Sequence, residues 1–147
     1  MTRLALFVLI LSLAACDRRS GPDFTPVEPP TPSGDVVHVR PYGDAERVEL
    51  MVGQTLAVEM QSHFEWREAV APTLLHRDDI LWGPADRAGQ DPGNTGNTSW
   101  QVFVYRAVEP GEESLTLVEA RPWEPDHIID RHVLTVQIQA DAGSPGR

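Results

Sequence analysis

The sequence lacks the residues on which several protein classes depend. Cysteine occurs once, at Cys16, so an intrachain disulfide is impossible and stability must come from packing. Lysine is absent, and the 12 basic residues, all arginine, are outnumbered by 22 acidic ones, which gives a formal net charge of −10. A chain this acidic has no electrostatic surface for nucleic acid, and we expect no nucleic-acid partner.

Motifs that carry catalysis are also missing. The chain has no GxSxG, no phosphate-binding glycine loop and no HExxH. The segment Asp126–His132 offers two histidines and two aspartates, which a metal could use, or which are simply polar residues of a loop. His127 and His132 are five residues apart, so on an extended strand their side chains point to opposite faces. This geometry disfavours a shared metal ion. We expect neither an enzyme nor a cofactor or metal.

The N-terminus has the pattern of an export signal. Arg3 is followed by an apolar run from Leu4 to Ala15, which is too short to cross about 30 Å of hydrocarbon as a helix. Leu13-Ala14-Ala15-Cys16 resembles the bacterial lipobox, which implies a diacylglycerol on Cys16; the alternative is an ordinary signal peptide with a chance cysteine. We therefore expect a signal peptide at 1–15 and a lipid as the only membrane contact. The domain would belong to the bacterial envelope, facing the periplasm or the exterior.

A proline-rich segment separates the anchor from the domain. Residues 16–35 contain few apolar side chains and five prolines, at Pro22, Pro26, Pro29, Pro30 and Pro32. Such a segment favours polyproline II at about 3.1 Å per residue, so it would lift the domain by roughly 50 Å. We assign residues 36–141 to the domain and 142–147 to a flexible tail.

Alternating hydrophobicity predicts an all-β domain. Apolar residues recur with period 2, the pattern of strands with one buried face, and no segment has a helical pattern. About seven strands at intervals of roughly ten residues favour an immunoglobulin-like β-sandwich. The strand Trp100–Tyr105 is apolar on both faces, which predicts a central strand or a partly covered outer face. Other strands are predicted around 36–39, 47–52, 56–61, 64–66, 80–82, 115–118 and 133–138.

A tryptophan between two prolines lies at a turn between the last two predicted strands. Arg121-Pro122-Trp123 is followed by Glu124-Pro125, and proline restricts the backbone before any partner binds. Tryptophan and arginine are also the residues that most often dominate interface energetics. From local sequence the ring is either an exposed contact residue or a buried aromatic that closes the end of the sandwich.

Several segments together resemble a known family. Gly93-Asn94-Thr95-Gly96, the strand from Trp100 and Arg121-Pro122-Trp123 have the order and spacing of the chagasin family of cysteine-peptidase inhibitors. Upstream, Gly53–Met60 looks like that family's early strand. The resemblance covers roughly residues 36–140 and implies a reversible inhibitor that inserts three neighbouring loops into the active-site cleft of a papain-like peptidase. It would act as a monomer with the peptidase as its protein partner.

The resemblance assigns three contact loops. The third is Arg121, Pro122 and Trp123; the second is Gly93, Asn94, Thr95 and Gly96, which departs from the family's G-x-G-G pattern at Thr95. The first is Ser62, His63 and Phe64, where the family has a longer loop over the catalytic cysteine. A loop shorter by about four residues predicts weaker inhibition, since hot-spot losses are ~2–4 kcal/mol. The alternative function is a non-inhibitory binding or scaffold lipoprotein that uses the same sandwich.

Overall fold

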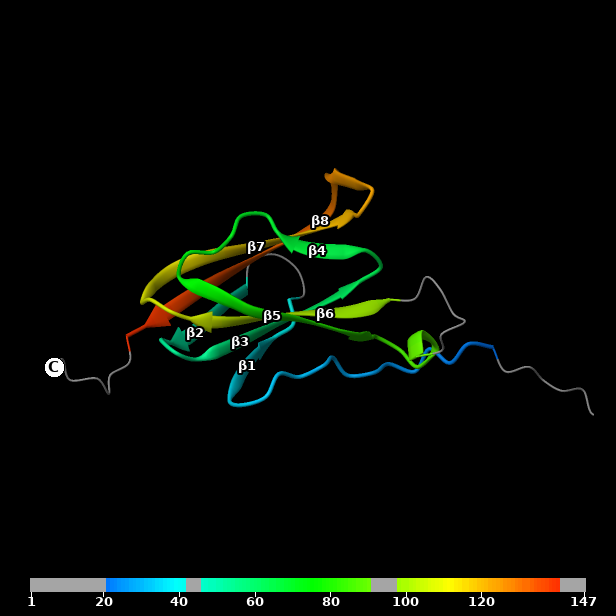
Figure 1. Ribbon diagram of the computed structural model, residues 1–147, viewed down its shortest axis with the longest axis horizontal. Helices are drawn as coiled ribbons and strands as arrows, with labels where there is room; N and C mark the ends of the chain where they lie inside the picture. Colours follow the sequence, from blue (N-terminus) through cyan, green and yellow to red (C-terminus); the bar gives the residue numbers. More distant parts are fainter. Residues whose placement is uncertain (1–20, 42–45, 91–97, 141–147) are drawn as a thin grey trace, which may run out of the picture.

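Two four-stranded β-sheets pack face to face in the computed structural model, which describes residues 21–41, 46–90 and 98–140 (Figure 1). In those ranges the only helical element is a short 3₁₀ turn, η1 (Ala88–Gln90). The strands are β1 (Val36–Val39), β2 (Glu46–Met51), β3 (Thr55–Ser62), β4 (Glu65–Glu68), β5 (Leu75–Pro84), β6 (Ser99–Ala107), β7 (Gly111–Arg121) and β8 (Glu124–Gln139).

The first five strands alternate between the two sheets along the chain, whereas β6 joins β5 in one sheet and β7 and β8 pair in the other. One sheet has the order β1-β3-β6-β5 and the other has the order β2-β8-β7-β4. The pairs β1/β3 and β2/β8 are parallel, whereas all the other neighbours are antiparallel. This arrangement confirms the predicted immunoglobulin-like β-sandwich, with eight strands in the described residues where about seven were expected.

The core lies between the sheets and follows from period-2 alternation. On β2, for example, Val48 and Leu50 are buried while Arg47 and Glu49 face outward. Tyr105 is fully buried in the core, and its hydroxyl donates to Glu68 Oε1 at 2.8 Å. Burial, reinforced by the Glu68 charge, raises the pKa of Tyr105 far above its ordinary value, so this phenol stays protonated.

A glycine turn takes the chain from one sheet to the other between β2 and β3. Gly53 has φ of +89°, a left-handed conformation that other residues adopt at a cost. Its amide donates to Ala107 O at 2.8 Å in one sheet, while the amide of Val52 donates to Gln139 O at 2.9 Å in the other. The turn therefore ties both sheets together at the end of the sandwich opposite the β7–β8 hairpin.

Two strands are longer than the sequence suggests. Residues 124–132, predicted as a loop, form the first half of β8 and pair with an extended β7. Residues 75–79, which lie in the connection between the strands predicted around 64–66 and 80–82, join 80–84 in the single strand β5, which has a bulge between Arg77 and Asp79. Both predictions were wrong for the same reason: these segments project from the sandwich or lie at a sheet edge, so their side chains do not alternate between buried and exposed.

The proline-rich segment packs along the sandwich, in contrast to the predicted tether. Residues 21–35, which we call the strap, are hydrogen-bonded to the segment after β5: Val27 N to Ala85 O at 2.8 Å, Arg87 N to Thr25 O at 3.0 Å and Ala88 N to Asp23 O at 2.7 Å. Pro29 is buried. The composition that favours polyproline II also leaves backbone carbonyls and proline rings available for packing on a sheet.

The strap explains why β6 is apolar on both faces. On the outer face of its sheet, Ala57, Val102 and Val104 form a second buried cluster, with Val36 and Leu81 packed against it. Thr31, Pro32 and Ser33 of the strap line a hollow over the same face together with Leu81 and Val104. Both predicted features of β6 are confirmed, because it is a central strand and its outer face is covered.

We predict that Trp100→Phe loosens the strap. Trp100 is buried, and its indole N–H donates to Val27 O at 2.7 Å, a bond that phenylalanine cannot make. The expected loss is about 1 kcal/mol in the free energy of unfolding, measured by urea denaturation. Trp82→Phe is the matched control, since Trp82 is 52% exposed, and should change stability by less than about 0.5 kcal/mol. Equal stability of both variants would contradict a structural role for the strap.

Candidate functional site

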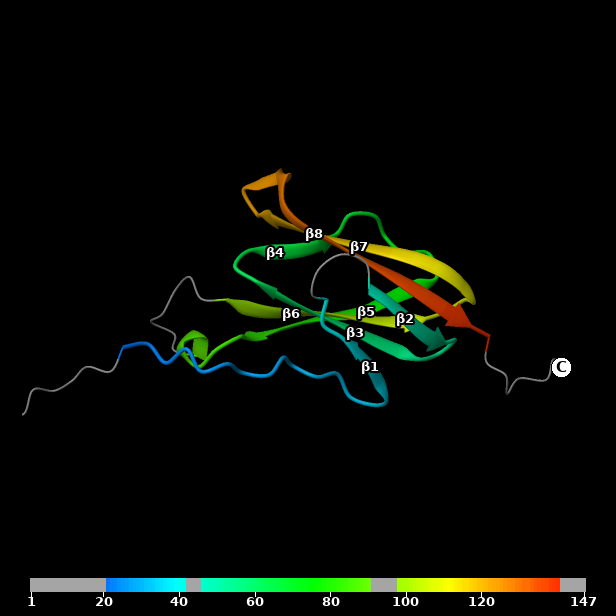
Figure 2. The same cartoon turned by 180° about the vertical axis from the view of Figure 1, so that it is seen from behind.

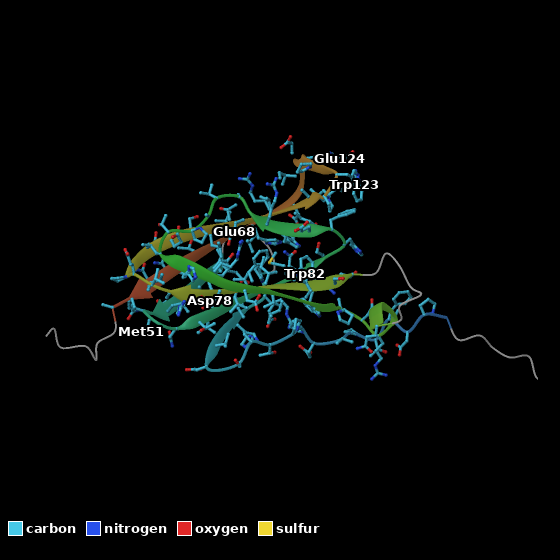
Figure 3. The ribbon with its side chains drawn as sticks, viewed as in Figure 1. Met51, Glu68, Asp78, Trp82, Trp123 and Glu124 are labelled. Atoms are coloured by element: carbon cyan, nitrogen blue, oxygen red, sulfur yellow. The ribbon has the colours of Figure 1, made fainter. Side chains whose placement is uncertain are left out.

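Two of the three predicted contact loops meet at one end of the sandwich. The β3–β4 turn crosses between the sheets there, and the β7–β8 hairpin rises beside it, with Trp123 and Glu124 at its tip (Figures 1 and 3). The tip bends away from the sheet because the β7/β8 register shifts on both sides of Ala120. This bend places the tip next to the turn.

The tip of the hairpin is a braced two-residue turn. Pro122 and Trp123 link Arg121 to Glu124, which are paired across the hairpin and joined by an ion pair of 2.9 Å. From the neighbouring strand, Arg67 donates to Pro125 O at 2.6 Å. The Trp123 ring is 69% exposed, so it is a surface residue and the alternative of a buried aromatic plug is excluded.

Phe64 supports Trp123 from below. The two rings meet edge to face, with centroids 6.0 Å apart and planes at 84°. The guanidinium carbon of Arg121 lies 5.5 Å from the centroid of the same phenylalanine ring. Edge-to-face pairs contribute about 0.5–1.5 kcal/mol beyond burial, and exposed cation–π contacts about 0.5–1 kcal/mol. We call Phe64, Arg121 and Trp123 the contact cluster.

The β3–β4 turn is short and tightly held. Only His63 and Phe64 separate the two strands. The Ser62 hydroxyl donates to Glu119 Oε1 at 2.5 Å, and the amide of Phe64 donates to the Ser62 oxygen at 2.8 Å. The turn therefore has no free length with which to project beyond the hairpin, as the shortened loop in the sequence indicated.

The predicted glycine loop, with Gly93, Asn94, Thr95 and Gly96, lies outside the described residues. The first described residue after it, Thr98, lies beside the β3–β4 turn: its Oγ1 is 3.4 Å from His63 Nδ1. Thr98 also accepts a hydrogen bond from the amide of Ala85 at 3.1 Å. The chain thus returns from this loop at the same end of the sandwich as the contact cluster.

Sequence reasoning missed the residues that hold the site in place. Buried Gln101, on β6, bridges the sheets: its side chain accepts from Trp66 N at 2.8 Å and donates to Trp66 O at 2.7 Å. Glu119 holds the β3–β4 turn by accepting from the Ser62 hydroxyl, and Arg67 holds the hairpin by donating to Pro125 O. A polar residue within the apolar run Trp100–Tyr105 was the one signal that could have revealed Gln101.

A second polar cluster lies where the strap meets β1 and β3. The buried carboxylate of Glu59 accepts from His38 Nδ1 at 2.8 Å through one oxygen and from Arg40 Nε at 2.9 Å through the other. The Arg40 guanidinium also stacks on Trp100, 4.8 Å from the ring centroid. Because both Glu59 oxygens are occupied within the protein, this cluster joins elements of the fold and offers no open ligand.

The other candidate chemistry does not assemble in the described residues. In 21–41, 46–90 and 98–140 no three metal-binding side chains of histidine, cysteine, aspartate or glutamate come together. His127 is exposed near Glu124, whereas His132 packs its ring on Trp66 with centroids 5.3 Å apart. Within the same ranges no helix is long and apolar enough to span a membrane.

Comparison with known proteins identifies similar folds. No protein-family model matches the sequence, and no curated protein matches it. Among solved structures, the cysteine protease inhibitor EhICP2 from Entamoeba histolytica matches with a TM-score of 0.57 and 12% identity, over 71% of this chain and 96% of that one. Amebosin matches with a TM-score of 0.58 and 16% identity, over 72% of this chain and all of that one.

A third structure, PbICP-C in complex with falcipain-2, matches with a TM-score of 0.47 and 14% identity, over 72% of this chain and all of that one. The first two matches span nearly the whole of each of those chains. The resemblance to chagasin-type inhibitors inferred from the sequence is thereby confirmed at the level of the fold.

We predict that Ser62→Ala destabilises this end of the sandwich. The substitution removes the hydroxyl that lies between the amide of Phe64 and the carboxylate of Glu119. Losing a part-buried bond to a charged acceptor should lower the free energy of unfolding by about 1.5–3 kcal/mol, measured by urea denaturation. Thr98→Ala, which removes a more exposed hydroxyl near the same turn, is the control. An effect of Ser62→Ala no larger than that of Thr98→Ala would show that the turn does not depend on Ser62.

Proposed function

We propose that the protein is a reversible inhibitor of papain-like cysteine peptidases that binds through the contact cluster. The observation that carries the proposal is the exposed Trp123 at the tip of an Arg-Pro-Trp hairpin. The sandwich that displays it has the fold of solved cysteine protease inhibitors. We assign no catalytic role to any residue.

The geometry of the hairpin suits a binding role. Association costs conformational entropy for each side chain that becomes ordered, at about 0.5–1.5 kcal/mol each. Trp123 is already ordered by Phe64, and its loop by Pro122 and the ion pair between Arg121 and Glu124. Most of this cost is therefore met during folding, and the large ring remains free to fill an apolar pocket on a peptidase.

Trp123 would supply most of the binding energy. In the proposed complex the short β3–β4 turn contributes little directly, because Phe64 lies beneath Trp123 rather than beyond it. Arg121 has a guanidinium at the rim, where it can pair with an acidic group of the peptidase. The loop that contains Gly93 and Gly96 would contribute backbone contacts.

The same short turn favours a second candidate function. A domain that cannot place a loop over the catalytic cysteine of a peptidase could bind beside the cleft without blocking it. The protein would then be a non-inhibitory binding or scaffold protein that uses the same contact cluster. Calorimetric binding without loss of peptidase activity would support this candidate over inhibition.

We further propose that the protein is attached to the bacterial envelope by a lipid on Cys16. The apolar run before this residue and the lipobox-like Leu13-Ala14-Ala15-Cys16 support the proposal. The full chain has a formal net charge of −10 and would gain no attraction from anionic lipid, so the anchor would provide the attachment. The domain would function as a monomer in the periplasm or outside the cell.

We predict that Trp123→Ala weakens inhibition strongly. With residues 17–147 titrated against papain, the substitution should raise the inhibition constant by about 30-fold or more, corresponding to a hot-spot loss of about 2 kcal/mol. Trp82→Ala removes another tryptophan that is more than half exposed, on β5, and should change the constant by less than about threefold. Equal potency of the two variants would place the contact elsewhere, and no inhibition at micromolar concentration would refute inhibition of papain.

We predict that Cys16→Ser abolishes lipid attachment. In a bacterial host that lipidates exported proteins, the natural sequence should incorporate labelled fatty acid and sediment with membranes, since the thiol is the attachment point. The variant should incorporate none. A variant that still incorporates labelled fatty acid, or a natural sequence that incorporates none, would contradict the lipid anchor.

A further inference from the structure

The tip of the β7–β8 hairpin is held less firmly by the β-ladder than the rest of its sheet. Arg121 pairs with Glu124, whereas the residue before it, Ala120, pairs with Ile128, so residues 125–127 have no partner on β7. A bulge of this kind interrupts the ladder and bends the strand. On the other edge, β2 pairs only with the second half of β8, and no other described strand covers the tip. Figures 1 and 2 show the tip projecting beyond the sheets.

Arg67 reaches this tip from β4, on the other side of β7. In the sheet register Arg67 lies opposite Val118 of β7, and its guanidinium extends across that strand to donate to Pro125 O at 2.6 Å. Pro125 is one of the residues without a partner on β7, so its carbonyl is available for this bond. Hydrogen bonds with a charged donor are about twice as strong as those between neutral groups.

The Arg67 side chain has no other polar partner in the described residues. Arg47, Arg77 and Arg106 each form an ion pair with a carboxylate of another strand. Arg67 forms none within the described ranges, and Pro125 O is the one acceptor of its side chain there. The contact with the hairpin is therefore the interaction that this arginine provides to the structure.

A hollow lies behind the tip. Its volume is about 160 Å³, and it is lined by Glu65, Arg67, Ala120, Arg121, Pro122 and Pro125. Atoms that face an unfilled space lose their van der Waals contacts on that side, so packing does not fix the tip against β4. The orientation of the tip depends instead on Arg67 on one side and on the ring of Phe64 on the other.

We propose that Arg67 is a positioning residue, which sets the orientation of Trp123 through the carbonyl of Pro125 and so determines how tightly the contact cluster binds. This inference rests on the proposed peptidase binding, and it assigns to Arg67 an action through Trp123 rather than a contact with the peptidase. Without the bond the tip can move into the hollow. Trp123 must then be ordered when it binds, and that entropic cost lowers affinity.

The orientation is tested first in the free protein, by fluorine NMR of chains labelled with 5-fluorotryptophan. The sequence contains four tryptophans, and Trp123→Phe assigns the signal of Trp123. Arg67→Met keeps the apolar stem of the side chain and removes its donors. We predict that this variant shifts and narrows the Trp123 signal, because the ring becomes more mobile, and leaves the signals of Trp82 and Trp100 unchanged.

Arg131→Met is the matched control. Arg131 is an exposed arginine of the same hairpin, and its side chain has no ion pair or hydrogen bond in the described residues. This variant removes the same charge and should leave the Trp123 signal as it is in the natural chain. A Trp123 signal that is the same in Arg67→Met as in Arg131→Met would overturn the proposal.

The second test measures inhibition of papain. Arg67→Met should raise the inhibition constant about tenfold, and Arg131→Met by less than about twofold. Arg67→Lys keeps a charged donor and should restore part of the loss. In a Trp123→Ala chain, Arg67→Met should have no further effect, because a positioning residue acts through the ring that has been removed. Additive losses in the double variant would show a direct contact with the peptidase and overturn the positioning role.

The two measurements separate this inference from the proposed function. Fluorine NMR needs no peptidase, so it tests the orientation of Trp123 whether or not the protein is an inhibitor. Absence of inhibition by the natural chain would refute the proposed function. Inhibition by the natural chain with equal potency of Arg67→Met would refute the positioning role and leave the proposed function intact.

Discussion

The end of the molecule that carries the contact cluster depends on how the chain crosses between the sheets after β3. Only His63 and Phe64 make this crossing, and Gln101 holds its far side by two hydrogen bonds to the backbone of Trp66. Desolvating a primary amide is unfavourable unless its groups are paired, and both Gln101 groups find partners in the opposite sheet. This polar link fixes the spacing of the sheets at the point where Phe64 must support Trp123.

The strap adds a second set of stabilising contacts, on the outer face of the sandwich. It covers apolar residues of β3 and β6 and takes part, through Val27, in the environment of Trp100. Arg40 then connects Trp100 to the buried carboxylate of Glu59. A segment that composition alone assigns to a linker is thus joined to the fold by hydrogen bonds, ring stacking and charge, so the folding unit in the described residues begins near residue 21.

The sequence predicted features that repeat locally and missed those that depend on tertiary partners. Alternation located the strands around Val48, Val58 and Val136, and the double apolar face of β6 indicated a cover without naming it. The projecting half of β8 shows no alternation, because neither face is buried, so its sequence predicts a loop and not a strand. For the site, the tryptophan turn and the short first loop were predicted, whereas the partners of Phe64 and Glu119 come from strands far apart in sequence.

The shortened first loop changes the role of Phe64 from contact to support. In a three-loop surface each loop can reach a partner separately, but here the β3–β4 turn is too short to project and its aromatic ring lies against Trp123. If the protein binds a peptidase, its affinity would then depend mainly on Trp123, which is already ordered in the free protein, rather than on contacts divided among three loops. A small number of fixed aromatic residues can dominate binding.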